Sequence, residues 1–403
     1  DPMMGVLADR TNSRWGKFRP YLLWFAIPFG ILGVLTFTTP DWSTSGRLIY
    51  AYITYTLLMM AYTVVNVPYS ALMGVMTPDT NERTVLSSYR FFAAFIATIA
   101  VQTFMLALVK RIGKDNPAVG WQGAMGIFSV AAVILLFITF WTTKERVHPP
   151  QGQKTSFGQD LTDLARNKPW LLIGGATVFQ LIYICMRGGA IAYYFKYFVK
   201  DQEVLSFGQV SWEKLSSTFL VTGTVATILG VLLTTRISKV VGKAAAYAAF
   251  LCIAGLATGA FYFLGPQSIA AMFVLQAVIS FCVGPVSVLQ WSIYTDAADY
   301  SEWVNHRRAT GLVMSASLFA LKLGIALGVS ALAWILAGYG FEANQEQTAK
   351  GLQGIRMVNS LYPAVFALIG AAFMFFYPLN KGAMAKVESE LIERRQRAEG
   401  GNG

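Results

Sequence analysis

Residues 48–76, LIYAYITYTLLMMAYTVVNVPYSALMGVM, contain no charged side chain over 29 positions. Because about 20 apolar residues in a helix cross the hydrocarbon core of a bilayer, this stretch is predicted to span a membrane. In its second half, Thr63, Asn66 and Ser70 recur at helical spacing and share one face. Polar groups at that depth are expected to face a wet cavity or another helix, because facing lipid is costly.

Two interpretations of this polar face remain open. Hydrogen bonding to a neighbouring helix is the ordinary role of a lone Thr or Ser in a membrane. Asn66, however, stands two residues before Pro68, which lacks a backbone N–H and tends to kink a helix. Loosened helices often line binding sites, and Arg90 adds a cation to the next span. We therefore favour a cavity, with Tyr62, Asn66 and Ser70 as candidate substrate-binding residues.

The composition is that of an all-α polytopic membrane protein. Of the 403 residues, 55% are hydrophobic and only 13% are charged. The net charge of +11 is expected to lie in cytoplasmic loops, and a nucleic acid is not an expected partner. The cysteines Cys185, Cys252 and Cys282 fall within apolar runs, without the spacing of a metal site or a disulfide framework.

Apolar stretches long enough to cross a bilayer recur along the whole chain. They lie at about 21–39, 48–76, 85–109, 122–143, 170–199, 215–236, 244–264, 268–295, 310–339 and 357–378. We predict an N-terminal half at 1–143, a central linker at 144–168, a C-terminal half at 169–378 and a tail at 379–403. The chain opens like the end of a further span, so one helix and most of a second, placed upstream, would restore two six-helix halves.

An internal repeat supports the two halves. Pro68, Ser70, Leu72 and Asp79 recur 217 residues later as Pro285, Ser287, Leu289 and Asp296. Parallel repeats of this kind build several transporter folds. When alternate loops are assigned to opposite sides of the membrane, one side carries most of the Lys and Arg residues. The loops on that side include the linker and the tail. By the positive-inside rule, the linker and the C-terminus are predicted to be cytoplasmic.

Four cations lie within predicted spans: Arg90, Arg187, Lys196 and Lys322. Such charges are costly in a bilayer and usually face a water-filled path or a partner. Lys196 is near the outer end of its span and is expected to snorkel to the interface. Arg90 stands near the start of its span, so snorkelling to the interface is its ordinary alternative. Arg187 and Lys322 are too deep for that.

Several motifs together resemble one transporter family. They are Asp1-Pro2-Met3-Met4-Gly5, Arg14-Trp15-Gly16-Lys17-Phe18-Arg19-Pro20, Asn66-Val67-Pro68-Tyr69, Arg90-Phe91-Phe92, Tyr193-Tyr194-Phe195 and Asp296-Ala297-Ala298-Asp299-Tyr300-Ser301-Glu302. The chain is similar over nearly its whole length to the glycoside-pentoside-hexuronide:cation symporters, which are the melibiose permease relatives of the major facilitator superfamily. The resemblance implies the major facilitator fold and a central sugar site between the halves.

The resemblance also implies roles for individual residues. Asp1 and Thr63 match positions of the cation site and would be ligands of Na⁺ if sodium is the coupling ion, or a proton site otherwise. A second carboxylate of that site would lie upstream of this chain. Arg90 and Lys322 match basic residues of the sugar site. Asn66 stands where the melibiose permease has an aspartate, and Ser70 where it has a tryptophan.

Arg187 is an additional cation for which the resemblance predicts a neutral polar residue. With Arg90 and Lys322 it would make the cavity positive, which favours an anionic sugar such as a hexuronate. The alternative is that these cations pair with carboxylates on the helices upstream.

Loop charges at equivalent places in the two halves suggest a gate. The resemblance pairs Arg83 and Arg308 with Asp296 and Asp299, which would close the cytoplasmic end by ion pairs when the site opens outward. Solvated loop charge is the alternative.

We therefore predict a secondary active transporter of the bacterial inner membrane, which couples sugar or glycoside uptake to Na⁺ or H⁺ and works as a monomer without other cofactors. A cation-independent facilitator, a carrier of another solute such as a lysolipid, and a non-transporting sensor remain alternatives. An enzyme is not expected, because His148 and His306 lack partners at ligand spacing and no phosphate-binding loop is present.

Overall fold

The computed structural model describes residues 1–114, 116–147, 157–204, 208–305 and 309–400. It is almost entirely helical, with one short antiparallel hairpin of β1 (Gln202–Val204) and β2 (Gly208–Val210). The N-terminal half consists of α1 (Pro2–Arg10), α2 (Arg19–Trp24), α3 (Ala26–Thr36), α4 (Thr44–Met76), α5 (Thr80–Gly113) and α6 (Pro117–Thr142). A short helix, α7 (Phe157–Arg166), follows in the linker.

The C-terminal half continues α8 (Lys168–Tyr193) into a π-helical turn, η1 (Tyr194–Val199). Its other elements are α9 (Trp212–Val241), α10 (Lys243–Ala260), the 3₁₀ turn η2 (Phe261–Phe263), α11 (Ile269–Asn305), α12 (Thr310–Gly338), α13 (Ala349–Asn359) and α14 (Leu361–Phe375). The tail forms α15 (Lys381–Gly400).

Among the described residues, nine helical segments are long and apolar enough to cross a bilayer. Large apolar side chains such as Ile134, Leu229 and Trp334 stay exposed on their outer surfaces, which is the surface that a lipid-facing protein presents. The chain is therefore an integral membrane protein, as its composition predicts.

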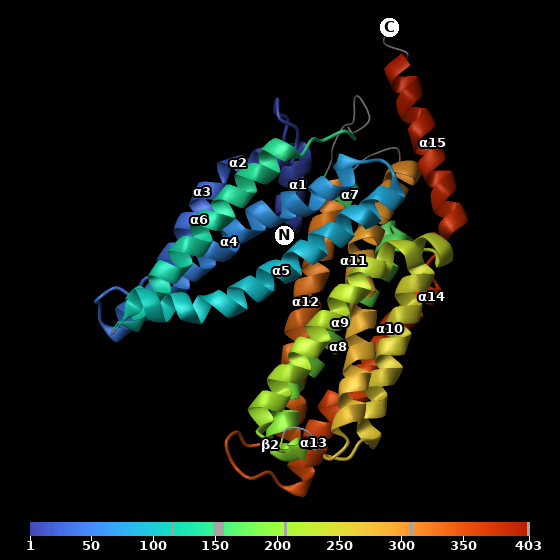
Figure 1. The fold of residues 1–403 in the computed structure, drawn as a ribbon. Helices are drawn as coiled ribbons and strands as arrows, with labels where there is room; N and C mark the ends of the chain where they lie inside the picture. Colours follow the sequence, from blue (N-terminus) through green and yellow to red (C-terminus); the bar gives the residue numbers. More distant parts are fainter. Residues whose placement is uncertain (115, 148–156, 205–207, 306–308, 401–403) are drawn as a thin grey trace.

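The two halves meet at one end and diverge toward the other (Figure 1). They join where α1 packs on α12 and where α5 packs on α9 and α11. We call this the closed end; it holds the last turns of α4 and α11 and the first turn of α5. The far end carries β2 and α13 in the C-terminal half (Figure 1).

The helices differ from the predicted spans in three ways. The expected loosening at Pro68 is not a break, since α4 stays helical across it, as α11 does across Pro285. The span predicted at 21–39 is divided at Phe25, and the last span starts earlier and is divided at Ser360. Finally, α11 runs on to Asn305 and carries into the helix the acidic residues that we expected in a loop.

Gly5 permits the close contact of α1 with α12 at the closed end. A Cβ atom at Gly5 would lie 2.2 Å from the hydroxyl oxygen of Ser315 and 2.4 Å from the carbonyl oxygen of Gly311. Asp9 strengthens the same contact, because its carboxylate accepts hydrogen bonds from the backbone N–H groups of Gly311 and Leu312, both at 2.9 Å. The carboxylate thereby caps the start of α12.

Replacing Gly5 by alanine is expected to destabilise the protein, because the methyl group would force α1 away from α12. Overpacking of this kind costs about 1–3 kcal/mol, which outweighs the gain in helix propensity. The matched control is Gly126→Ala on α6, where an added Cβ meets nothing within 4 Å. Thermal unfolding in detergent compares the two. Equal melting temperatures for both variants would contradict the close contact.

Candidate functional site

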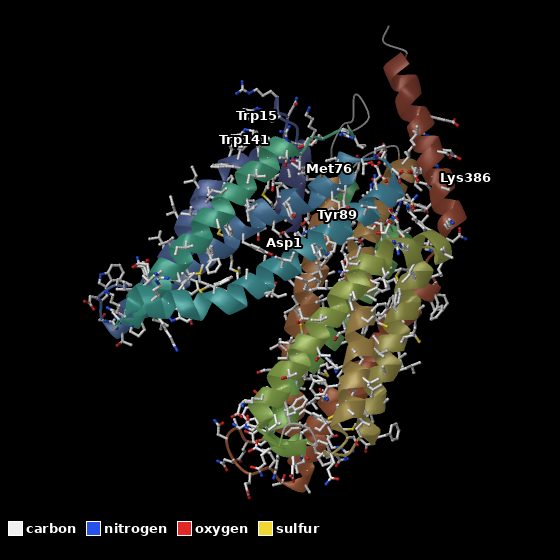
Figure 2. All side chains as sticks on the ribbon, in the orientation of Figure 1. Asp1, Trp15, Met76, Tyr89, Trp141 and Lys386 are labelled. Atoms are coloured by element: carbon white, nitrogen blue, oxygen red, sulfur yellow. The ribbon has the colours of Figure 1, made fainter. Side chains whose placement is uncertain are left out.

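An ion pair between the two halves forms the centre of the candidate site. Lys322 of α12 donates from Nζ to Oδ1 of Asp1, at the start of α1, over 2.7 Å. The same Nζ lies 3.5 Å from Oγ1 of Thr63 on α4. The Asp1 side chain is only 4% exposed whereas that of Lys322 is 45% exposed. The ammonium group therefore lies where the two oxygen donors expected to bind a cation come together; Figure 2 labels Asp1.

Tyr62 and Asn66 extend this cluster along α4. The Asn66 side-chain amide donates to the Tyr62 hydroxyl over 3.2 Å, one helical turn away. The Tyr62 ring centroid lies 5.9 Å from Nζ of Lys322, and the residue is 38% exposed. Tyr62 and Thr63 thus stand beside Lys322, and Asn66 stands beside the Tyr62 hydroxyl.

Arg90 of α5 lies against α4 and α11. Its guanidinium stands 4.7 Å from the ring centroid of Tyr69 and 4.0 Å from that of Trp291 on α11. The Tyr62 hydroxyl interacts electrostatically with both Arg90 and Lys322, and the Tyr69 hydroxyl interacts with Arg90. The Nη1 atom of Arg90 is buried and has no hydrogen-bond partner within the described parts of the chain. A donor held in this way is available to an incoming ligand.

Two predicted substrate-binding residues lie elsewhere. Ser70 shares a face with Thr63 and Asn66, but it is completely buried and its hydroxyl is without a partner in the described structure. Arg187 is 6% exposed and donates from Nη2 to Oε1 of Gln276 over 2.7 Å, within the C-terminal half. The structure thus does not bring Arg187 to Arg90 and Lys322, because its side of α8 faces α9 and α11.

Three of the four predicted gate residues, Arg83, Asp296 and Asp299, meet at the closed end and are buried in helices. Arg83, which is 0% exposed, donates from Nη1 to the Asp299 carboxylate and lies 3.9 Å from that of Asp296. Its Nε also donates to the carbonyl oxygen of Thr77 over 3.0 Å. These contacts join α5 to α11 and so join the halves. Arg308 lies outside the described residues.

Three further residues of this network were not predicted. Lys243 at the start of α10 donates to both carboxylate oxygens of Asp296 at 2.8 and 3.0 Å, and the Thr80 hydroxyl donates to one of them at 3.2 Å. Glu388 of α15 accepts from the backbone N–H of Thr80 over 3.2 Å. Lys243 ends the basic segment Arg236-Ile237-Ser238-Lys239-Val240-Val241-Gly242-Lys243, which weakly repeats the Gly16-Lys17 loop, whereas nothing in the sequence points to Glu388.

Burial raises the pKa of Glu388 above its ordinary value, and Asp79 and Asp296 add to the rise; the Thr80 N–H and Arg83 act against it. Packing of α15 against the start of α5 therefore favours the protonated carboxyl of Glu388. This packing is strongest below the ordinary pKa of a glutamate, about 4.3, and weakens as the pH rises through the raised pKa.

Amide hydrogen exchange across α15, corrected for its intrinsic pH dependence, is expected to show protection that falls as the pH rises. Glu388→Gln removes this dependence, whereas Glu393→Gln, on the same helix, keeps it. A pH dependence that survives in Glu388→Gln would contradict the assignment. Figure 2 shows α15 with Lys386 labelled.

Comparisons with known proteins agree with this arrangement. A family model described as MFS/sugar transport protein matches residues 1–381. The chain is 37% identical over 401 residues to the "Inner membrane symporter YicJ" of Escherichia coli (strain K12), covering 99% of this chain and 85% of that protein. It is 32% identical over 388 residues to the "Isoprimeverose transporter" of Lactiplantibacillus pentosus, covering 94% and 78% of the two chains.

Among solved structures, the chain resembles a crystal structure of the E. coli fucose:proton symporter FucP. The TM-score is 0.66 at 15% sequence identity, over 94% of this chain and 87% of that one. At this identity the likeness concerns the fold, and it confirms the fold expected from the sequence.

Proposed function

Because this chain belongs to the MFS/sugar transport protein family and has the major facilitator fold, we propose that it is a secondary active transporter that carries a sugar or glycoside together with a monovalent cation. It is a transporter and not an enzyme. The observation that carries the proposal is the cluster of Asp1, Thr63, Lys322 and Arg90 between the halves. Such sites between pseudo-symmetric halves are where rocking carriers bind solute and ion.

The Arg90 end of the cluster suits a sugar. Trp291 and Tyr69 supply aromatic faces that can pack against the C–H face of a sugar ring, and Asn66 and Tyr62 supply groups that bind hydroxyls. Arg90 also forms no ion pair with a carboxylate of the described residues. A glycoside that carries a carboxylate, such as a hexuronide, would neutralise this guanidinium. We therefore propose a hexuronide as the preferred solute.

The Lys322 end of the cluster suits coupling. In the conformation described, the Lys322 ammonium neutralises the Asp1 carboxylate. A Na⁺ ion that binds Asp1 and Thr63, or a proton that binds Asp1, would release Lys322 toward the solute. Binding of the ion then favours binding of the solute, which is the thermodynamic requirement for symport.

The buried network of Arg83, Lys243, Asp296 and Asp299 is the proposed gate. It holds the halves together at the closed end, and its opening would let the halves rock and expose the site on that side. We propose that the closed end is cytoplasmic, because it carries the linker and the tail, and that the protein resides in the bacterial inner membrane. One chain supplies every residue of the cluster, so a monomer suffices.

Solute-induced current in proteoliposomes tests the proposal, with the carrier that contains this chain and with Na⁺ and pH varied separately. A hexuronide should induce current, and its uncharged parent sugar should compete weakly. Current that depends on Na⁺ assigns sodium, and current that depends only on pH assigns the proton. Uptake without dependence on either ion would indicate a facilitator. Equal competition by the two sugars would contradict the hexuronide as the preferred solute, but it would not contradict symport.

A further inference from the structure

A second group of cations, Arg187 and Arg356, lies within the C-terminal half and takes no part in the proposed transport site. Arg187 stands 5.2 Å from the ring centroid of Phe261 and 5.9 Å from that of Phe219. Its Nη2 donates to Gln276, but its Nε is buried and has no hydrogen-bond partner among the described residues.

Arg356 of α13 has the same surroundings. It stands 5.0 Å from the ring centroids of both Phe198 and Tyr262, and its Nη2 donates to the carbonyl oxygen of Tyr262 over 2.6 Å. Its Nε is also buried without a partner in the described structure. Each guanidinium thus has one neutral acceptor, two aromatic faces and a buried Nε–H group without an acceptor.

Tyr194 is connected to both arginines through aromatic rings that it shares with them. Its ring centroid is 5.1 Å from that of Phe198, which Arg356 contacts, and 6.3 Å from that of Phe261, which Arg187 contacts. Arg356 and Arg187 are the cations that act electrostatically on its hydroxyl group. That hydroxyl is buried and likewise has no partner in the described parts of the chain.

These groups all lack a hydrogen-bond acceptor that carries negative charge. Two N–H groups and one O–H group are donors that lack an acceptor, and neither arginine has a carboxylate within ion-pair distance among the described residues. The aromatic faces offset only part of the cost of burying each unpaired charge. A water molecule would accept hydrogen bonds but would leave the charge uncompensated.

We propose that this cluster, with Arg187, Tyr194 and Arg356 as ligands, binds one small monovalent anion of the halide class, with chloride as its representative. A sugar does not fit, because Phe219 and Phe261 are each 1% exposed and close the cluster from within. Arg356, which is partly exposed, provides the approach from the far end. The bound anion holds α8, η1 and α13 together and thereby stabilises the far end of the C-terminal half.

Bromide in place of chloride tests the proposal directly, because bromide scatters anomalously. Crystals of the carrier grown in bromide should show an anomalous peak beside the Tyr194 hydroxyl and Nε of Arg187. The absence of a peak at this cluster, with peaks only at the protein surface, would overturn the proposal. This readout is independent of transport, so its failure leaves the proposed symport untouched.

Thermal unfolding provides the second test, at constant ionic strength and with gluconate replaced stepwise by chloride. The wild-type melting temperature should rise with chloride and saturate. Arg187→Gln should abolish the rise, and Tyr194→Phe should raise the half-saturating chloride concentration about tenfold, because one hydrogen bond to the ion is lost. Lys350→Gln removes an exposed charge from α13 and should keep the wild-type response. A response retained in Arg187→Gln would also overturn the proposal.

Discussion

Arg83→Gln is expected to destabilise the described conformation by about 3–5 kcal/mol, because removal of one partner of a buried ion pair leaves a buried charge uncompensated. Arg83 is 0% exposed, and it contacts Asp299 and Asp296, which are each 4% exposed. Lys243 can neutralise only one of the two carboxylates. The second carboxylate would become accessible to water only if α5 and α11 separated. The variant should therefore favour a conformation in which the halves part at the closed end.

Chemical unfolding in detergent measures the loss of stability, and labelling of a cysteine at position 84 reports the separation. Thr84 is 2% exposed and its hydroxyl lies 3.0 Å from that of Ser292 on α11, so it should become reactive in the variant. The matched control is Arg47→Gln, since Arg47 forms an exposed pair with Asp41 that is worth at most about 1 kcal/mol. A second change, Asp299→Asn, should partly restore stability. Equal effects of Arg83→Gln and Arg47→Gln would argue for solvated charge and against a gate.

Arg90→Gln is expected to weaken solute binding by about 10- to 100-fold, since hydrogen bonds to a charged group are worth about 1.5–3 kcal/mol. Arg90→Lys should recover only part of this loss, because an ammonium group does not stack on Trp291 and Tyr69 as a planar guanidinium does. For a hexuronide the loss should exceed that for its uncharged parent sugar. Binding of the hexuronide and of its uncharged parent sugar to the purified wild-type, Arg90→Gln and Arg90→Lys carriers measures these losses.

The control for Arg90 is Tyr89→Phe, one residue earlier on α5, where the side chain is 69% exposed and labelled in Figure 2. This variant should bind solute as the wild type does. Equal losses for the charged and the neutral sugar in Arg90→Gln would contradict the pairing of Arg90 with a solute carboxylate.

The helices and the rare charges within them were predictable from sequence. Length and apolarity define the spans, and the cost of a charge in a bilayer singles out Arg90 and Lys322, which the structure places between the halves. The depth of Arg187 in its span did not predict which side of α8 it occupies. Periodicity places Ser70 on the same face as Asn66, but neighbouring helices bury Ser70 and leave Asn66 partly exposed.

Contacts between distant segments were the least predictable. Trp291 stands over Arg90 from 201 residues further along the chain, and no sequence pattern pointed to it. The acidic residues of the gate were expected in a loop because the apolar pattern stops before Asp296. Their pairing with Arg83 and Lys243 permits α11 to continue through them as a buried helix.

The central claim is that Asn66, Arg90 and Lys322 face one water-accessible space between the halves, closed at one end. Labelling of a cysteine introduced at Asn66, in a background without the three native cysteines, tests it most directly with a membrane-impermeant thiol reagent. We predict rapid labelling from the side opposite the closed end and protection by a transported solute, with no labelling of Ile134→Cys on the lipid-facing surface of α6. Equal reactivity at both positions, or labelling that no solute slows, would contradict the claim.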